Sequence, residues 1–389
     1  MPADASDVII EVIDGGFFTT VQDLGRFGYQ RYGVPVSGAM DLFALRAANA
    51  LTGTPEGAAA LEITLHGPRL RFLIDTMLAM TGGDLRPRLD DAPMPMWQPA
   101  AVAAGAVLSF DGGGEGLRAY LAAQGGFDVP LVLGSRSTFT RTGLGGFEGR
   151  AIKTGDRLAA FTTSAALVQG RTLPAVDIPR YGHRHLVRVL PGPQDDAFTA
   201  AGMATLLSAE YLISPNSDRI GCRLEGPRIE HRAGADIISD GTPFGAIQVA
   251  GDGLPIILMA DRGTTGGYAK IATVISADLY QIAQALPGEL VGFQAISMEE
   301  ALMALREQEA TLERLAQSSV VRFLRRHYTV GVDGTDYGVT VGFTEQHDGS
   351  VPDQAVAASQ VGAVCVEMIE PGCVGRVEVQ IAETPGANP

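Results

Sequence analysis

A chain of 389 residues is too long for one ordinary core, and its 46% hydrophobic and 19% charged content is typical of a globular protein with two or three domains. The formal net charge of −15 argues against a nucleic-acid partner, because phosphate binding needs clustered Lys and Arg. Forty-nine glycines beside 15 Phe, 9 Tyr and 1 Trp indicate tight turns between short strands, so we predict a mainly β protein.

Cysteine use and the amino terminus favour a cytosolic location. Three cysteines, Cys222, Cys365 and Cys373, are too few for a disulfide framework and are not spaced as a zinc site. The first ten residues are acidic where a secretory signal would be basic, and no apolar run is long enough to cross a membrane. The histidines are scattered, and His183 and His185 have no third ligand nearby, so we predict no metal site.

The amino-terminal elements surround one glycine-rich loop. Residues 8–21 predict a strand, a turn and a second strand. The signature loop that follows, Val21 to Asp41, reads VQDLGRFGYQRYGVPVSGAMD and is too irregular for a helix and too glycine-rich for a plain strand. Such a segment more often builds a site than a core. We then expect a short helix with Asp41 as its N-cap and Gly53 at its end.

Two further glycine-rich segments, residues 123–150 and 237–293, lie on either side of a weakly patterned connection over residues 162–179. Residues 211–229 echo the first half, because SPNSDRIGCRLEGPRI again places a polar loop before a strand that ends in Gly-Pro-Arg. The echo suggests two related barrels in tandem. A short helix is predicted over residues 276–286.

The carboxyl-terminal part has its own local signals. Ser297 to Glu300 form a capping box, and leucines after it predict a surface helix to about Gln317. The segment RRHYTVGVDGTDYGVTV predicts a hairpin on an Asp333-Gly334 turn, which we interpret as an appendage that docks a partner. The expected domains are residues 1–178, 179–296 and 297–389.

Three motif blocks in these segments resemble the biotin-dependent carboxyltransferase family, which includes allophanate hydrolase subunit 2, part of urea carboxylase and the C subunit of 5-oxoprolinase. The blocks are QDLGRFGYQRYGVPVSGAMD, GGFDVPLVLGSRST, and SDGTPFGAIQV with PIILMAD and TTGGY. The resemblance covers roughly residues 8–300. It implies tandem cyclophilin-like β-barrel domains, and the many short strands with glycine turns agree with barrels.

Biotin-dependent carboxyl transfer must stabilise charge on the biotin ureido oxygen, hold the carboxyl group and remove a proton from the acceptor. We expect Arg26 and Arg136 to supply the positive charge and Asp23, Asp41 or Asp261 to take the proton, with the choice among the aspartates left open. The candidate substrate-binding residues are Gln22, Ser37, Ser137, Gln248, Thr264, Thr265, Gly266, Gly267 and Tyr268.

Structural explanations compete with these roles. Asp23 and Arg26 are three residues apart and could pair only to hold a turn that also contains Ser37. The Gly266-Gly267-Tyr268 stretch could be a strand bulge, and Ser135 with Arg136 could cap a turn.

Cofactors and partners follow from the resemblance. Neither lysine of the chain, Lys153 or Lys270, is flanked by methionine, so we expect any biotin to come in trans on another polypeptide. No nucleotide-binding loop is visible in the sequence, so we expect any ATP to bind to a partner subunit. The implied partners are a companion that resembles allophanate hydrolase subunit 1 or the 5-oxoprolinase B subunit and, where biotin is used, a carrier or carboxylase.

The leading interpretation is the C subunit of an ATP-hydrolysing 5-oxoprolinase, which belongs to a heteromeric enzyme acting on a small amide. One alternative is a urea or allophanate type carboxyltransferase subunit that uses carboxybiotin. Another is a non-catalytic regulatory protein of the kinase-inhibitor antagonist type, although the polar and glycine-rich motif blocks exceed what a docking surface needs. Nothing resembles the catalytic sequence of a cyclophilin prolyl isomerase.

Overall fold

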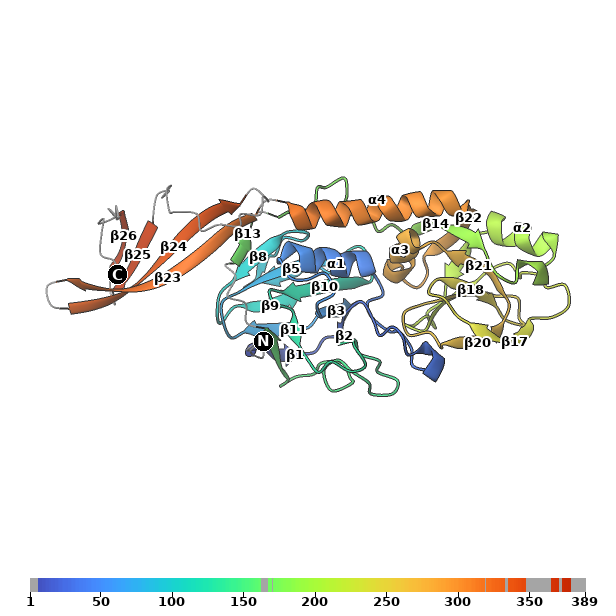
Figure 1. Ribbon diagram of the computed structural model, residues 1–389, viewed down its shortest axis with the longest axis horizontal. Helices are drawn as coiled ribbons and strands as arrows, with labels where there is room; N and C mark the ends of the chain where they lie inside the picture. The colour runs from blue at the N-terminus through green and yellow to red at the C-terminus, as the bar shows by residue number, and fades with distance from the viewer. Residues whose placement is uncertain are drawn as a thin grey trace, which may run out of the picture. The chain divides into compact units, whose positions relative to one another are not determined.

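The computed structural model describes residues 6–161, 167–169, 171–318, 320–332, 335–347, 365–370 and 373–378 (Figure 1). The chain divides into two compact units, Met1–Thr162 with Thr172–Ala316, and Thr163–Arg171 with Gln317–Pro389. The predicted mainly β fold is confirmed, since strands are the main elements of both units. Within the described ranges, no helix combines the length and the apolar character that crossing a bilayer requires.

The amino-terminal half of the larger unit contains two sheets. Their orders are β11-β12-β1-β4-β9-β6-β7 and β2-β3-β10-β5-β8. The predicted strand, turn and strand of residues 8–21 are present, yet the two strands join different sheets, β1 pairing with β12 and β4 and β2 with β3. The bounds are β1 Ser6–Asp14, β2 Phe18–Gln22, β3 Ala60–Thr64, β4 Arg69–Phe72, β5 Thr76–Gly82, β6 Pro87–Leu89, β7 Ala92–Pro93, β8 Pro99–Val102, β9 Val107–Phe110, β10 Arg118–Ala123, β11 Phe127–Asp128 and β12 Arg157–Phe161.

Helix α1, Leu42–Leu51, confirms the helix predicted after the signature loop. The Asp41 side chain accepts a hydrogen bond from the Ala44 amide as the N-cap, and Gly53 follows the helix with a φ of 69°. Alanines on its buried face let the helix pack closely on β5 and β10. The helix therefore anchors the end of the signature loop in a buried cluster (Figure 1).

The second half of the larger unit is a closed barrel. Its strand order is β14-β21-β18-β19-β16-β15-β22, and parallel pairing of β14 with β22 completes the circle. Buried residues such as Val187, Ile247, Ile257 and Val291 fill it. Beside it, β17 and β20 form a two-stranded ribbon. The bounds are β14 Arg184–Pro191, α2 Ala200–Ser208, β15 Tyr211–Ile213, β16 Gly221–Glu225, β17 Asp236–Gly241, β18 Ala246–Val249, β19 Pro255–Leu258, β20 Thr265–Tyr268, β21 Lys270–Val274, α3 Leu279–Gln284 and β22 Leu290–Ala295.

Helix α4, Met298–Gln317, confirms the predicted surface helix and its capping box. The Glu300 amide donates to Ser297 Oγ at 3.2 Å, and the Ser297 amide donates to the Glu300 carboxylate at 2.7 Å. Leu312 and Leu315 are buried in the same cluster as α1, so the helix belongs to the larger unit. The predicted domain boundary before residue 297 instead places this helix in the carboxyl-terminal extension.

The smaller unit is one sheet ordered β13-β23-β24-β25-β26, with the bounds Leu167–Gln169, Val320–Val332, Thr335–His347, Cys365–Glu370 and Cys373–Glu378. The predicted hairpin is present as β23 and β24, which pair from Val320 with His347 to Val332 with Thr335. Its expected turn residues, Asp333 and Gly334, lie outside the described residues, as do residues 162–166 and 170 of the expected connection between domains.

The pH dependence of stability tests the role of Asp41, which caps helix α1 at the end of the signature loop. Burial raises the pKa of its carboxyl above the ordinary 3.8, although hydrogen bonds from Gln284, Ala44 and Tyr181 oppose that rise. As the pH rises, the folded state therefore keeps the Asp41 proton to a higher pH than the unfolded state does. The stability that this proton contributes is fully present below about pH 3.8, and it is lost as the pH rises through the folded pKa. We expect Asp41→Asn, which keeps a capping oxygen, to gain in Tm relative to the parent as the pH rises above about 3.8. A pH-independent difference in thermal unfolding would contradict this.

Candidate functional site

A cavity of about 380 Å³ opens where the signature loop meets the third glycine-rich segment. Both halves of the larger unit contribute to it, although their motif blocks are some 200 residues apart in the chain. The last residue of β17 and the two residues after it supply one wall, and the loop between Met259 and β20 supplies another. The lining residues are Gln30, Val36, Gly241, Thr242, Pro243, Arg262, Gly263 and Thr264.

Arg262 gives this cavity a positive charge. Its Nε donates to the Thr242 carbonyl at 2.8 Å, its Nη1 donates to the Met259 carbonyl at 3.2 Å, and its guanidinium lies 5.2 Å from the centre of the Phe244 ring. Among the described residues, no carboxylate lies within 4.0 Å of it. Burial lowers the pKa of Arg262 to about 10 despite the charge of Asp261. Arg262 thus stays protonated at neutral pH and can bind an anion.

Ser37 and Asp261 are the chain neighbours of the lining residues Val36 and Arg262. The Ser37 hydroxyl donates to the Asp261 carboxylate and lies 3.3 Å from the Thr138 carbonyl. Ser37 has a φ of 58°, which few residues other than glycine adopt, and such strain is common where a side chain is held for chemistry. Both side chains are nearly buried, at 5% and 6% exposure.

Arg219 holds Asp261 from the other side. Its Nε and Nη2 donate to the two carboxylate oxygens of Asp261 at 2.9 and 3.0 Å, its Nη1 pairs with Glu62, and its Nη2 also donates to the Gly38 carbonyl at 2.6 Å. Burial alone would lower the pKa of Arg219, but Asp261 and Glu62 outweigh it and raise that pKa. We call Ser37, Glu62, Arg219 and Asp261 the buried ionic cluster.

Asp23 binds the second glycine-rich segment. Its Oδ1 accepts hydrogen bonds from the Gly25 amide at 2.8 Å and from Ser135 Oγ at 2.7 Å, and its Oδ2 accepts from the Arg136 amide at 2.5 Å. Three donors thus occupy a carboxylate that is only 6% exposed. This arrangement favours a role in holding the two loops together.

Arg26 holds the same segment and is fully buried. Its Nε donates to the Val132 carbonyl and its Nη2 to the Ser137 carbonyl, both at 2.9 Å, while its Nη1 has no hydrogen-bond partner in the described part of the chain. Burial lowers the pKa of Arg26, and the charges of Asp23 and Asp261 oppose this shift. No ion pair within the described ranges joins Arg26 to Asp23, although the two are three residues apart.

The other predicted site residues fall into separate places. Thr264 lines the cavity, and Asp41 caps α1. Residues 265–268 form β20, and the irregularity in its pairing with β17 places the extra residues on β17, between Asp236 and Asp240, and not in the Gly266-Gly267-Tyr268 stretch where the bulge interpretation expected them. The Gln22 side chain donates to the Thr138 carbonyl, and the Gln248 side chain donates to the Tyr268 carbonyl. The Arg136 side chain donates to the Val129 carbonyl and lies over the Phe161 ring, and the Ser137 hydroxyl is hydrogen-bonded to that of Ser135. Thr265, Gly266, Gly267 and Tyr268 lie in β20.

Sequence reasoning did not select Glu62, Arg219 or Arg262. For the two arginines a signal existed. Arg262 directly follows Asp261 in the third block, and Arg219 ends the SPNSDR stretch that echoes the signature loop. The structure adds that the echoing loops touch, through Arg219 and the Gly38 carbonyl.

The two neighbouring histidines share one carboxylate. His183 Nδ1 and His185 Nε2 each lie 2.8 Å from an oxygen of Glu289. Burial acts to raise the pKa of Glu289, but these contacts and the Leu286 amide lower it overall. In the part of the chain that the structure describes, no group of three or more His, Cys, Asp or Glu side chains is arranged to hold a metal ion.

Residues 32–295 match the family profile described as carboxyltransferase domain, subdomain A and B. The chain belongs to the biotin-dependent carboxyltransferase family. It is 38% identical over 308 residues to the C subunit of 5-oxoprolinase from Escherichia coli, covering 79% of this chain and 98% of that protein. It is 37% identical to a putative urea carboxylase of Emericella nidulans over 79% of this chain and 26% of that protein. The solved urea amidolyase of K. lactis matches with a TM-score of 0.75 and 28% identity over 95% of this chain and 23% of that one.

A substitution at Gly145 tests how tightly Arg26 packs in this carboxyltransferase-family fold. A Cβ at Gly145 would lie 2.3 Å from the Ser137 carbonyl oxygen and 2.5 Å from Arg26 Nη2, whereas a Cβ at Gly143 would meet nothing within 4 Å. Both glycines have a positive φ, of 68° and 67°, so alanine strains both backbones alike. We expect Gly145→Ala to cost about 1–3 kcal/mol more than Gly143→Ala in urea unfolding. Equal costs would contradict a tightly seated Arg26.

A second prediction concerns Arg219 in the buried ionic cluster. Arg219→Met removes the cation of Asp261 and leaves Glu62 with Arg118 alone, at 4.0 Å, so we expect a loss of about 3–5 kcal/mol in the free energy of unfolding. Arg223→Met is the matched control, because Arg223 is exposed on β16, and it should change stability by about 0.5 kcal/mol or less. Denaturant unfolding of both variants measures the difference, and a loss below about 1 kcal/mol for Arg219→Met would contradict the assignment.

Proposed function

We propose that the chain is the C subunit of a 5-oxoprolinase-type enzyme, a cytosolic heteromer that uses ATP to open the lactam of 5-oxoproline to glutamate. The match to the 5-oxoprolinase C subunit supports this proposal, because it extends over 98% of that protein. By contrast, the matched urea carboxylase and urea amidolyases are far longer than this chain. ATP binding and further catalytic groups are assigned to companion subunits.

The observation that carries the proposal is the unpaired guanidinium of Arg262 in the cavity. 5-Oxoproline is an anion at neutral pH, and its carboxylate fits a protonated arginine that has no carboxylate partner among the described residues. At about 4 Å and an effective dielectric of about 20, such a pair is worth about 4 kcal/mol of Coulomb energy before desolvation. Urea is neutral and offers this arginine no such partner.

Ser37 and Asp261 suit the amide side of the same substrate. The Ser37 hydroxyl already donates to Asp261, so its oxygen can accept a hydrogen bond from the lactam N–H. Arg219 keeps Asp261 in place as an acceptor. In this proposal Arg262 binds the carboxylate, Ser37 orients the ring nitrogen, and Asp23 and Arg26 position the loops around them.

A urea-type carboxyltransferase subunit is the second candidate. One observation favours it: the match to the urea amidolyase structure covers 95% of this chain, whereas the match to the 5-oxoprolinase relative covers 79%. Biotin would then have to come in trans. Lys270 is 1% exposed and its Nζ lies 2.9 Å from Asp240, so a carrier role for it is disfavoured. Arg262 would hold the carboxyl group under transfer.

An affinity pull-down of the full chain from its native cell extract tests the choice. Recovered complexes are assayed for ATP hydrolysis that depends on 5-oxoproline or on urea. Non-biotinylated partners with activity that depends on 5-oxoproline support the proposal. A biotinylated partner with urea-dependent turnover would overturn it in favour of the second candidate.

A variant pair sharpens that assay. We expect Arg262→Met to raise the KM for 5-oxoproline by roughly 100-fold, about 2.7 kcal/mol of lost binding, because the carboxylate loses its charged partner. Partner recovery in the pull-down should be unchanged. Arg223→Met, on the exposed face of β16, should keep the parent KM. An unchanged KM in Arg262→Met would remove the observation on which the proposal rests.

A further inference from the structure

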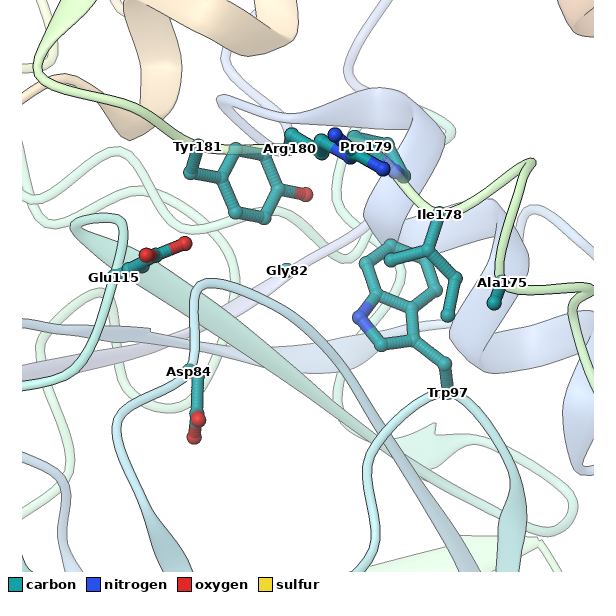
Figure 2. A pocket seen from close by; sticks show the side chains of 9 residues that line it. All are labelled: Gly82, Asp84, Trp97, Glu115, Ala175, Ile178, Pro179, Arg180 and Tyr181. Carbon is teal, nitrogen blue, oxygen red and sulfur yellow. The ribbon is translucent and has the colours of Figure 1, made fainter.

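A second cavity, of about 240 Å³, lies in the larger unit and shares no lining residue with the first (Figure 2). Trp97 and Tyr181 bring aromatic rings to it, and Ile178 adds an apolar side chain. Arg180 and Glu115 bring one charge of each sign. None of these residues belongs to the signature loop or to the buried ionic cluster, so the site proposed for 5-oxoproline does not account for this cavity.

Trp97 brings a free hydrogen-bond donor to the cavity. Its side chain is 6% exposed, yet among the hydrogen bonds of the described residues none involves the indole N–H. Figure 2 shows the indole nitrogen facing the open centre, toward Gly82. Among the described residues the indole nitrogen is not one of the buried polar atoms that lack a partner, so it is open to the cavity and available to a ligand there. An acceptor such as a carboxylate oxygen suits an N–H that cannot accept.

The two charges are available to a ligand. In Figure 2 the Glu115 carboxylate turns inward beside the Tyr181 ring, and Arg180 lies on the upper rim. Both side chains are exposed, and within the described part of the chain neither forms an ion pair with the other or with a third group. Opposite charges that line one cavity without pairing can each bind the opposite charge of one small zwitterion. Asp84 adds to the acidic side, with Oδ1 already bonded to the Arg86 amide.

We propose that this cavity is a binding site for a free α-amino acid with an apolar side chain. The carboxylate binds Arg180 and the Trp97 N–H, the ammonium binds Glu115, and the side chain packs on Ile178. The aromatic faces of Trp97 and Tyr181 favour the cationic end as well. The Tyr181 hydroxyl is 3.4 Å from Asp41 Oδ2, so its ring is held from outside the cavity.

Trp97 is the single tryptophan of the chain, so its fluorescence reports on this cavity alone. The full chain is titrated with L-leucine, L-valine and L-isoleucine, each to about 10 mM, which is about ten times a millimolar dissociation constant. A saturable change in the emission is expected for at least one. N-Acetylation, which removes the ammonium, and conversion to the amide, which removes the carboxylate, should each weaken binding of that amino acid roughly tenfold or more.

Variants assign the charges. Arg180→Ala should erase the preference for the free acid over its amide, and Glu115→Gln should erase the preference for the free amine over its N-acetyl form. Arg141→Ala, at an exposed arginine outside both cavities, should bind like the parent. Calorimetry repeats each titration, so that binding without a fluorescence change is still seen. Absence of heat and of emission change with all three amino acids overturns the proposal, and so does binding that survives both charge deletions.

Discussion

The buried contact between Arg219 and the two carboxylates of Asp261 and Glu62 is the constraint on which the rest of the larger unit depends. One guanidinium connects the barrel half to β3 and, through the Gly38 carbonyl, to the signature loop. Two buried carboxylates close together would repel each other, and the shared Arg219 offsets that repulsion, while Arg118 Nε lies 4.0 Å from Glu62 as a second cation. Because Asp261 also accepts from Ser37, the same contact holds a serine whose φ of 58° is strained.

The charged side chains of the signature loop and of the cavity differ in their surroundings. Asp23 and Arg26 are saturated or enclosed by the second glycine-rich segment, and they position loops. Arg26 and Arg262 both bond only backbone carbonyls among the described residues, but Arg26 is fully buried whereas Arg262 lines a cavity. A charge that a ligand cannot reach cannot bind it, so the guanidinium in the cavity is where specificity is expected.

The signature loop links both cavities of the larger unit. Gln30 and Val36 line one, and Asp41 at the end of the loop receives a hydrogen bond from Tyr181, which lines the other. The family fold alone does not choose a reaction, because related chains occur in proteins named for 5-oxoproline and for urea. The side chains that line the cavities differ from the residues that hold the loops.

Local sequence patterns were enough to predict several elements and the family. Asp41 before α1 and the Ser297 to Glu300 box of α4 act through hydrogen bonds within four residues, so local pattern predicts them. The motif blocks likewise contained Ser37, Asp261 and Thr264. Tertiary structure decided what those blocks do. Arg219 and Glu62 are 157 residues apart and meet only when the barrel docks on the sheets, while Asp23 and Arg26, three apart, turn to different partners. Buried charges pair by three-dimensional proximity and desolvation, which spacing along the chain does not encode.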